Sequence, residues 1–236
     1  MSQHSTYRHL RADRIIATLE KLSARIGERF PDAGLAQVCA ELVGSSRTLS
    51  SEAAALARPS LAWPLAGIIL VSTIAALLFT GLRYLKLDGE WASPTEVIQG
   101  LEAAVNLLIL VGGAIWFVLT LEERAKRRRA LDALHQLRAL AHVIDMHQLT
   151  KDPTVVLNAH KTANSPERTM TRFELTRYLE YCAEMQALVG KLAALFADRM
   201  RDAVVINAVN DIEDLTTGLG RKIWQKITII SDLEEG

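Results

Sequence analysis

Charged side chains are missing from two long stretches of this 236-residue chain. Residues 59–82 and residues 103–121 contain no Asp, Glu, Lys or Arg. Each stretch is long enough to cross the apolar core of a bilayer as a helix, which takes about 20 residues. The sequence therefore predicts two transmembrane helices, at about residues 61–83 and 99–121. Because neither carries an ionisable side chain at its centre, a proton relay or a voltage sensor is not indicated.

Cysteine is scarce. Cys39 and Cys182 are far apart in the sequence and form no C-x-x-C pair, so the sequence supports neither a disulfide framework nor a cysteine-based zinc site. Both cysteines have apolar neighbours in segments with helical spacing, where free cysteine is usually buried. We therefore expect two buried, reduced thiols.

Motifs of catalysis and nucleotide binding are also missing. The chain has no P-loop, no G-x-G-x-x-G following a strand and no G-x-S-x-G. Its 27 basic and 27 acidic residues give a formal net charge of zero, which argues against a general nucleic-acid binder. We expect a protein that is not an enzyme, with no catalytic residues, no cofactor and no nucleic-acid partner.

Two weaker polar patterns remain. His142 and Asp145 lie three residues apart, so a helix places them on one face, while His147 points elsewhere. A metal site would need a further ligand, such as His160 or a residue of another subunit. The acidic run at 207–214 could also hold an ion or do acid–base work. For both patterns we favour structural or solvated side chains, and we expect no metal.

Helical spacing of apolar residues extends through both ends of the chain. Residues 7–30 carry one apolar stripe, Pro31 ends that helix, and Asp32 is placed to cap a second helix at 33–43. A turn is expected at 44–51, followed by a short helix at 52–57. The stripe of the first helix consists of Ile15, Leu19, Leu22, Ile26 and Phe30.

Two further helices are expected near the C-terminus. Thr171 and Glu174 form a capping box that opens a helix to about residue 200. A last helix runs from about 203 to 231, and Gly218 and Gly220 within it suggest a kink or a close helix contact. Its stripe is the most regular in the chain and consists of Val205, Val209, Ile212, Leu215, Leu219, Ile223, Ile227 and Ile230. No segment is typical of a strand.

A basic run follows the second apolar stretch, and it orients the predicted hairpin. The run consists of Arg124, Lys126, Arg127, Arg128 and Arg129. By the positive-inside rule this end faces the cytoplasm, where the run would also attract anionic lipid headgroups. Two spans then place both termini in the cytoplasm and the connection at 84–98 outside. We expect a multi-pass protein of a bacterial inner membrane.

The helical pattern of the second span continues well beyond the basic run. A single helix of about 50 residues is expected, which would be about 75 Å long. The resulting fold is all-α: a transmembrane hairpin with a cytoplasmic helical bundle built from both termini. Its parts are N-terminal cytoplasmic helices at 1–57, the hairpin at 58–122 and a C-terminal cytoplasmic helical domain at 123–236.

Small and polar residues in the second span suggest contacts between helices. Gly112 and Gly113 would allow close approach, and Asn106 could hydrogen-bond across helices. These contacts could lie within one hairpin or between subunits. Glu96 and Glu102 lie at the outer end of this span, where they could form acidic rings in an oligomer or be solvated at the interface.

This layout resembles the SLATT class of bacterial two-transmembrane modules: N-terminal helices, two spans with a brief connection, a basic exit and a helical tail. That class is proposed to act as pore-forming effectors. The stretches at 137–153 and 165–185 also resemble an uncharacterised bacterial membrane-protein family. Neither resemblance assigns a function to a particular residue.

Two functions fit the sequence best. Because two helices cannot enclose an aqueous path, a pore would require a homo-oligomer, gated by the cytoplasmic helices. The alternative is a non-conducting membrane scaffold whose last helix, through its stripe at 205–230, docks a soluble cytoplasmic partner. A metal-dependent membrane enzyme using His142, His147 and the acidic run at 207–214 is a third hypothesis.

Overall fold

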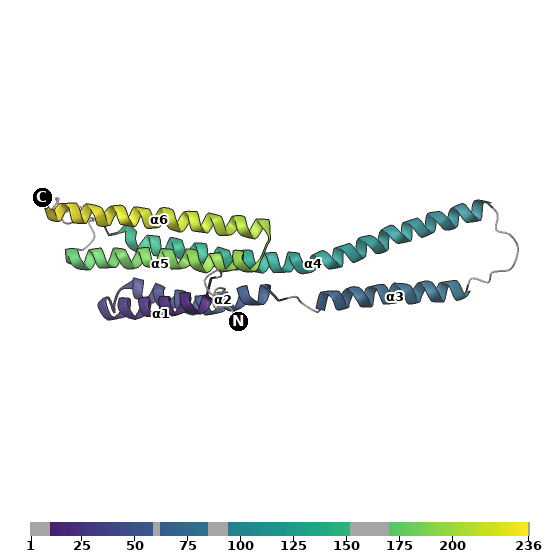
Figure 1. The fold of residues 1–236 in the computed structure, drawn as a ribbon, viewed down its shortest axis with the longest axis horizontal. Helices are drawn as coiled ribbons and strands as arrows, with labels where there is room; N and C mark the ends of the chain where they lie inside the picture. The colour runs from purple at the N-terminus through teal and green to yellow at the C-terminus, as the bar shows by residue number, and fades with distance from the viewer. Residues whose placement is uncertain (1–9, 59–61, 85–93, 152–169, 236) are drawn as a thin grey trace, which may run out of the picture. The chain divides into compact units, whose positions relative to one another are not determined.

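The computed structural model describes residues 10–58, 62–84, 94–151 and 170–235, and every regular element within them is an α-helix (Figure 1). This confirms the all-α class. The helices are α1 (Ala12–Arg29), α2 (Gly34–Leu56), α3 (Ala62–Tyr84), α4 (Pro94–Leu149), α5 (Arg172–Arg199) and α6 (Ala203–Glu235). Residues 85–93, in the predicted connection, and residues 152–169 lie outside the described residues.

The chain divides into two compact units. One contains Met1–Ala57 and Arg129–Gly236, and we call it the bundle unit. The other contains Arg58–Arg128, and we call it the apolar unit. Helix α4 is continuous across the boundary, because its 56 residues begin in the apolar unit and end in the bundle unit. The expectation that the second apolar stretch continues as one long helix is therefore confirmed.

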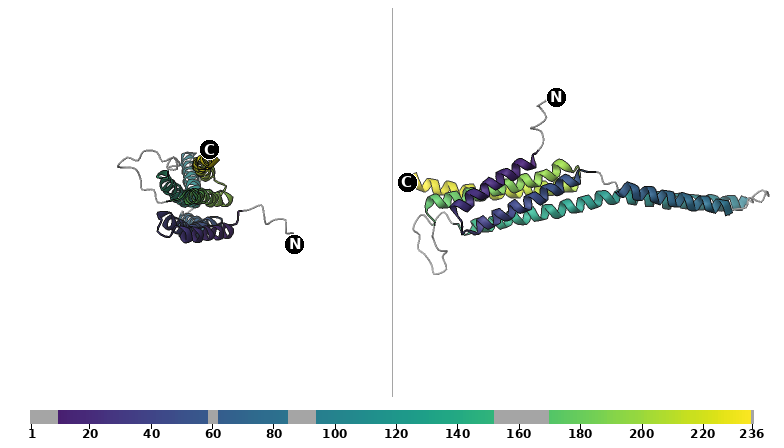
Figure 2. Two further views of the ribbon diagram at one scale, coloured as in Figure 1. Left: turned by 90° about the vertical axis from the view of Figure 1, so that its left-hand side faces the viewer. Right: turned by 90° about the horizontal axis from the view of Figure 1, so that it is seen from below.

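In the bundle unit, α5 is the central helix. It packs against α1, α2 and α6, and the end-on view shows α1 and α2 as one layer with α5 and α6 above them (Figure 2). The apolar stripes predicted for α1 and α6 lie in one core, to which α5 also contributes, except that Leu215 is only partly buried. Phe30 contributes to this core with edge-on contacts to the rings of Tyr178 and Tyr181.

Helix α2 differs from the expectation. The predicted turn at 44–51 and separate helix at 52–57 are wrong, because one helix runs from Gly34 to Leu56. The serine hydroxyls that suggested a turn are bonded inside this helix: Ser46 Oγ donates to the carbonyl of Val43 at 2.7 Å, and Ser50 and Ser51 make the same kind of bond. Such bonds satisfy hydroxyl groups without ending a helix. Asp32 does not cap α2, whose N-cap is Ala33.

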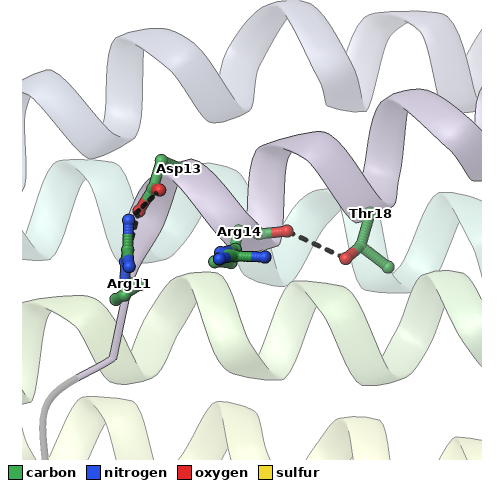
Figure 3. Close-up of polar contacts among 4 residues, drawn as sticks. All are labelled: Arg11, Asp13, Arg14 and Thr18. Carbon is green, nitrogen blue, oxygen red and sulfur yellow. Dashed lines mark hydrogen bonds and ion pairs between the residues drawn. The ribbon is translucent and has the colours of Figure 1, made fainter. Parts of the chain in front are cut away.

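Polar side chains stabilise several helix ends. At the start of α1, Arg11 Nη2 lies 2.6 Å from Asp13 Oδ2 and Thr18 Oγ1 donates to the carbonyl of Arg14 (Figure 3). The capping box predicted for α5 is present: Glu174 N donates to Thr171 Oγ1 at 3.3 Å, and Thr171 N donates to Glu174 Oε2 at 2.7 Å. The two bonds of the α5 capping box satisfy amide groups that lack a partner within the helix, whereas the N-cap of α1 has no side-chain cap bond.

A lysine from another helix binds the free carbonyl groups at the C-terminal end of α4. Lys226 Nζ, on α6, donates to the carbonyl of Gln148 at 2.9 Å and to the carbonyl of Lys151 at 3.2 Å. A cation is favourable at this end of a helix, where carbonyl groups lack partners. Lys226 therefore ties the end of α4 to α6.

Candidate functional site

The N-terminal part of α4 has the length and composition of a membrane span. Among the described residues, only Ile98–Leu149 is long and apolar enough to cross a bilayer, and none of its most apolar 18-residue window is buried. Helix α3 contains a shorter apolar stretch, Leu65–Ala76. Both stretches belong to the apolar unit or begin in it.

Large apolar side chains of this part of α4 are not covered by the other described residues. Leu108 is 74% exposed, Leu110 is 71% exposed and Trp116 is 63% exposed. Burying such a side chain is worth about 1.5–3 kcal/mol, so leaving many of them in water would be strongly unfavourable. An apolar surface of this extent is typical of a helix that contacts lipid or another protein.

The polar residues of the same segment share one face of α4. Glu102 and Thr120 are 18 residues apart, which is about five full turns, so their side chains project in nearly the same direction. Asn106 and Gly113 lie within about 40° of that direction, whereas Gly112 points about 80° away from it. Glu102, Asn106, Gly112 and Gly113 are exposed, and a Cβ added at either glycine would meet no atom within 4 Å.

We call Glu102, Asn106, Gly113 and Thr120 the polar face of α4. Among the described residues, no atom lies within 4 Å of a Cβ placed at Gly113, so the contact expected for this glycine stays a prediction. The side chain of Glu96, the other predicted acidic residue, lies outside the described residues.

The basic run lies next to this segment, and its members differ in their surroundings. Lys126 Nζ lies 2.8 Å from Glu122 Oε1 and donates to the carbonyl of Arg58 at 2.9 Å. Arg127 is partly buried, while Arg124, Arg128 and Arg129 are exposed. The three exposed guanidinium groups are thus available to anionic groups, whereas Lys126 is already engaged.

The weak metal candidates do not come together. His142 is exposed, Asp145 Oδ1 accepts a hydrogen bond from Gln148 Nε2 at 2.7 Å, and His147 packs against Gly34. His160 lies outside the described residues, and those residues hold no group of three metal-ligating side chains.

Both cysteines are free and buried. Burial raises the pKa of the Cys39 thiol to about 11 and that of Cys182 to about 12. Since the thiolate is the reactive form, both groups are chemically quiet at neutral pH.

The apolar stripe of α6 is not free to receive a partner. From Val205 to Ile230 its members lie in the core, and Leu215, the most open of them, still packs against it. In this fold, α5 and its neighbours cover the stripe that the sequence offered as a docking surface for a soluble partner. Docking there would require the bundle to open.

The outer side of the α5–α6 pair carries a groove that the sequence did not reveal. Its volume is about 490 Å³, and its lining combines small residues with the indole of Trp224. The groove-lining residues are Ala183, Ala187, Gly190, Lys191, Glu213, Thr216, Thr217, Gly220, Arg221 and Trp224. The heptad-like spacing of 213, 217, 220 and 224 on α6 was the one signal that could have indicated it.

Comparison of the chain with models of protein families, with curated proteins and with solved structures gives no match.

Proposed function

We propose that this chain is a homo-oligomeric integral membrane protein of a bacterial inner membrane. Spans at 61–83 and 99–121 form a hairpin, and both termini face the cytoplasm. Copies of α4 surround a pore that the cytoplasmic bundle gates. The observation that carries this proposal is the apolar segment of α4, whose most apolar window has no buried residue.

Lipid satisfies that surface better than any element of the chain. An α-helix bonds its backbone internally, so it can enter a bilayer without leaving polar groups unpaired. The exposed Arg124, Arg128 and Arg129 follow the apolar segment directly, where lipid headgroups would lie. Their charge supports a cytoplasmic location for this end of the span.

The polar face of α4 supports assembly around a pore. An asparagine in a membrane prefers a polar partner or water over lipid. Glu102 and Asn106 lie on one face, so one rotation of α4 turns both of them towards the centre of a ring of subunits. In such a ring Glu102 supplies negative charge near the outer mouth and favours cations.

The continuity of α4 supports a mechanical link between the bundle and the pore. A movement of the bundle that rotates or tilts the C-terminal part of α4 is carried along the same helix to the polar face. This arrangement agrees with the gated effector suggested by the resemblance to the SLATT class.

Liposome flux tests the proposal. Full-length protein that resists carbonate extraction and conducts cations in liposomes is the expected result, and Glu102→Gln should lower the preference for cations over anions. Asp132→Asn, an exposed acidic position further along α4, is the matched control and should leave selectivity unchanged. Extraction of the wild-type chain by carbonate, or the absence of flux from membrane-inserted protein, would contradict the proposal.

A further inference from the structure

A cleft between α1 and α5 gathers three arginines around one aromatic ring. Its volume is about 410 Å³, and it is lined by Arg25, Glu28, Arg29, Arg177 and Tyr181. Arg25 and Arg29 lie about one turn apart on α1, and Arg177 and Tyr181 lie about one turn apart on α5. Because these two helices pack against each other, the two pairs bring three guanidinium groups into one cleft.

Two of the guanidinium groups are held by carboxylates from outside the cleft. Arg25 Nη2 lies 2.6 Å from Glu184 Oε2, and Arg177 Nη1 donates to Glu180 Oε2. Neither glutamate lines the cleft. Arg25 also lies over the Tyr181 ring, with its Cζ 5.7 Å from the ring centre. These contacts orient both arginines, and since a guanidinium group carries five N–H donors, others remain for a ligand.

The third guanidinium group, that of Arg29, is held by an aromatic ring. Its Cζ lies 5.1 Å from the centre of the Phe173 ring, and among the described residues it forms no ion pair. Hydrogen bonds from Thr171 lower the pKa of the nearby Glu174, and the charge of Arg29 adds to this effect. The Glu174 carboxylate is already bound in the capping box, so Arg29 is the arginine with most of its donors open.

The cleft has more positive than negative charge, and at least one donor there lacks an acceptor. Three of its four charged lining residues are basic. Arg177 Nε is buried and has no hydrogen-bond partner among the described residues. A buried donor without an acceptor costs about 1–3 kcal/mol, and such a group commonly indicates a missing water or ion. An anion in the cleft would supply negative charge and acceptors to these arginines.

We propose that this cleft binds the phosphate group of a small molecule. Guanidinium groups are planar and donate paired hydrogen bonds to phosphate or carboxylate oxygens. A carboxylate has only two oxygens, whereas a terminal phosphate presents three and carries a charge of about −1.5 to −2. The phosphate therefore suits three guanidinium groups that approach from two helices.

The size of the cleft indicates that the ligand is larger than a phosphate ion. Small-molecule sites have volumes of about 300–1,000 Å³, and this cleft lies within that range. The site belongs to the bundle unit alone, so it goes beyond the proposed pore and does not depend on it. A ligand bound here would join α1 to α5 and stabilise the bundle unit by mass action.

Calorimetric titration of the full-length protein in detergent tests the site. The probe is inorganic pyrophosphate, and acetate at the same ionic strength is the comparison. We expect saturable binding of one pyrophosphate per chain and at least about tenfold weaker binding of acetate. Wild-type protein that shows no saturable binding of pyrophosphate would overturn the proposal.

Arginine variants test the assignment of the cleft. Arg29→Gln should weaken the binding of pyrophosphate at least about tenfold, and Arg29→Lys should bind with intermediate affinity, because lysine keeps the charge but loses the planar fork. Arg14→Gln is the matched control, since Arg14 is exposed on the same helix about 22 Å away along its axis and does not line the cleft. Equal affinities of Arg14→Gln and Arg29→Gln would contradict the proposed site.

A second pair of ligands identifies the source of the phosphate. Glycerol 3-phosphate and dihexanoyl phosphatidic acid carry the same phosphate monoester, without and with lipid chains. Equal affinities would assign the site to a soluble organic phosphate, and at least about tenfold tighter binding of the lipid would assign it to a headgroup, provided that Arg29→Gln weakens the binding in either case. Binding that Arg29→Gln leaves unchanged would overturn the proposal.

Discussion

The two parts of α4 have similar helical geometry and opposite surroundings. Between Ala130 and Gln148 the helix buries a line of residues at spacings of three and four, formed by Ala130, Leu134, Leu137, Ala141, Ile144 and Gln148. Between Ile98 and Leu121 the side chains are far more apolar, and none of the most apolar 18-residue window is buried. The less apolar part of the helix therefore packs in the protein core, and the more apolar part remains exposed.

The difference shows what apolar content alone does not. A stripe of apolar residues on an otherwise polar helix predicts packing against protein, as in the C-terminal part of α4. A helix that is apolar on nearly all sides, with a narrow polar face, predicts a lipid environment and a polar contact within it.

Truncating a core residue should give the largest effect, a loss of stability of the bundle unit. Leu137 is 0% exposed, and Leu137→Ala should lower the free energy of unfolding by about 2–5 kcal/mol through lost contacts and a cavity. Leu108→Ala, at an exposed leucine in the apolar part of α4, should change the stability of the bundle by less than about 0.5 kcal/mol. Thermal unfolding followed by circular dichroism in detergent compares them, and equal losses would remove the distinction between the two parts.

An introduced charge should have the opposite pattern, with a large effect in the apolar part of α4 and little effect on the bundle. Ile109→Arg places a charge in the middle of the apolar segment, at a cost of about 2.5–3.5 kcal/mol for insertion. We expect this variant to shift towards the carbonate-extractable fraction. Ile229→Arg, at an exposed position of α6 in the bundle, is the control and should stay with the wild type. Normal insertion of Ile109→Arg would show that this segment does not lie within lipid.

The end of α4 offers a smaller effect. Lys226→Met keeps most of the apolar stem but removes the ammonium group that binds two carbonyls at the helix end. Hydrogen bonds from a charged donor contribute about 1.5–3 kcal/mol, so we expect a loss of about 2 kcal/mol in unfolding experiments. Lys222→Met, exposed one turn earlier on α6, should be nearly neutral, and a similar loss in both variants would argue against the capping role.

The smallest effect is expected at the surface of the bundle. Arg25 Nη2 lies 2.6 Å from Glu184 Oε2, with both side chains well exposed. Exposed ion pairs contribute about 0.2–1 kcal/mol and are screened by salt. The coupling between Arg25→Ala and Glu184→Ala should therefore not exceed this value, and it should fade between low and high salt, while any cost of Arg25→Ala beyond it includes the guanidinium's contact with the Tyr181 ring. A coupling independent of salt would indicate packing instead of charge.

Local patterns predicted the parts of the fold that depend on neighbouring residues. The stripes of α1 and α6 and the Thr171–Glu174 box act within one or two helical turns, so spacing in the sequence is enough to identify them. The turn expected at 44–51 failed because serine hydroxyls can bond to solvent in a turn or to the carbonyl three residues earlier in a helix. Burial of Ser46 and Leu49 in the core favours the helix.

For the candidate site, the sequence determined which segment is uncovered, because absence of charge over some 20 residues is a property of composition. It also determined that Glu102 and Asn106 share a face. The tertiary structure decided which glycine brings helices together: Gly190 meets Thr216, while Gly218 and Gly220 meet nothing within 4 Å. The tertiary structure also decided that the α6 stripe is buried in the core and that a groove remains between α5 and α6. Both depend on how these two helices pack, which spacing within one helix does not specify.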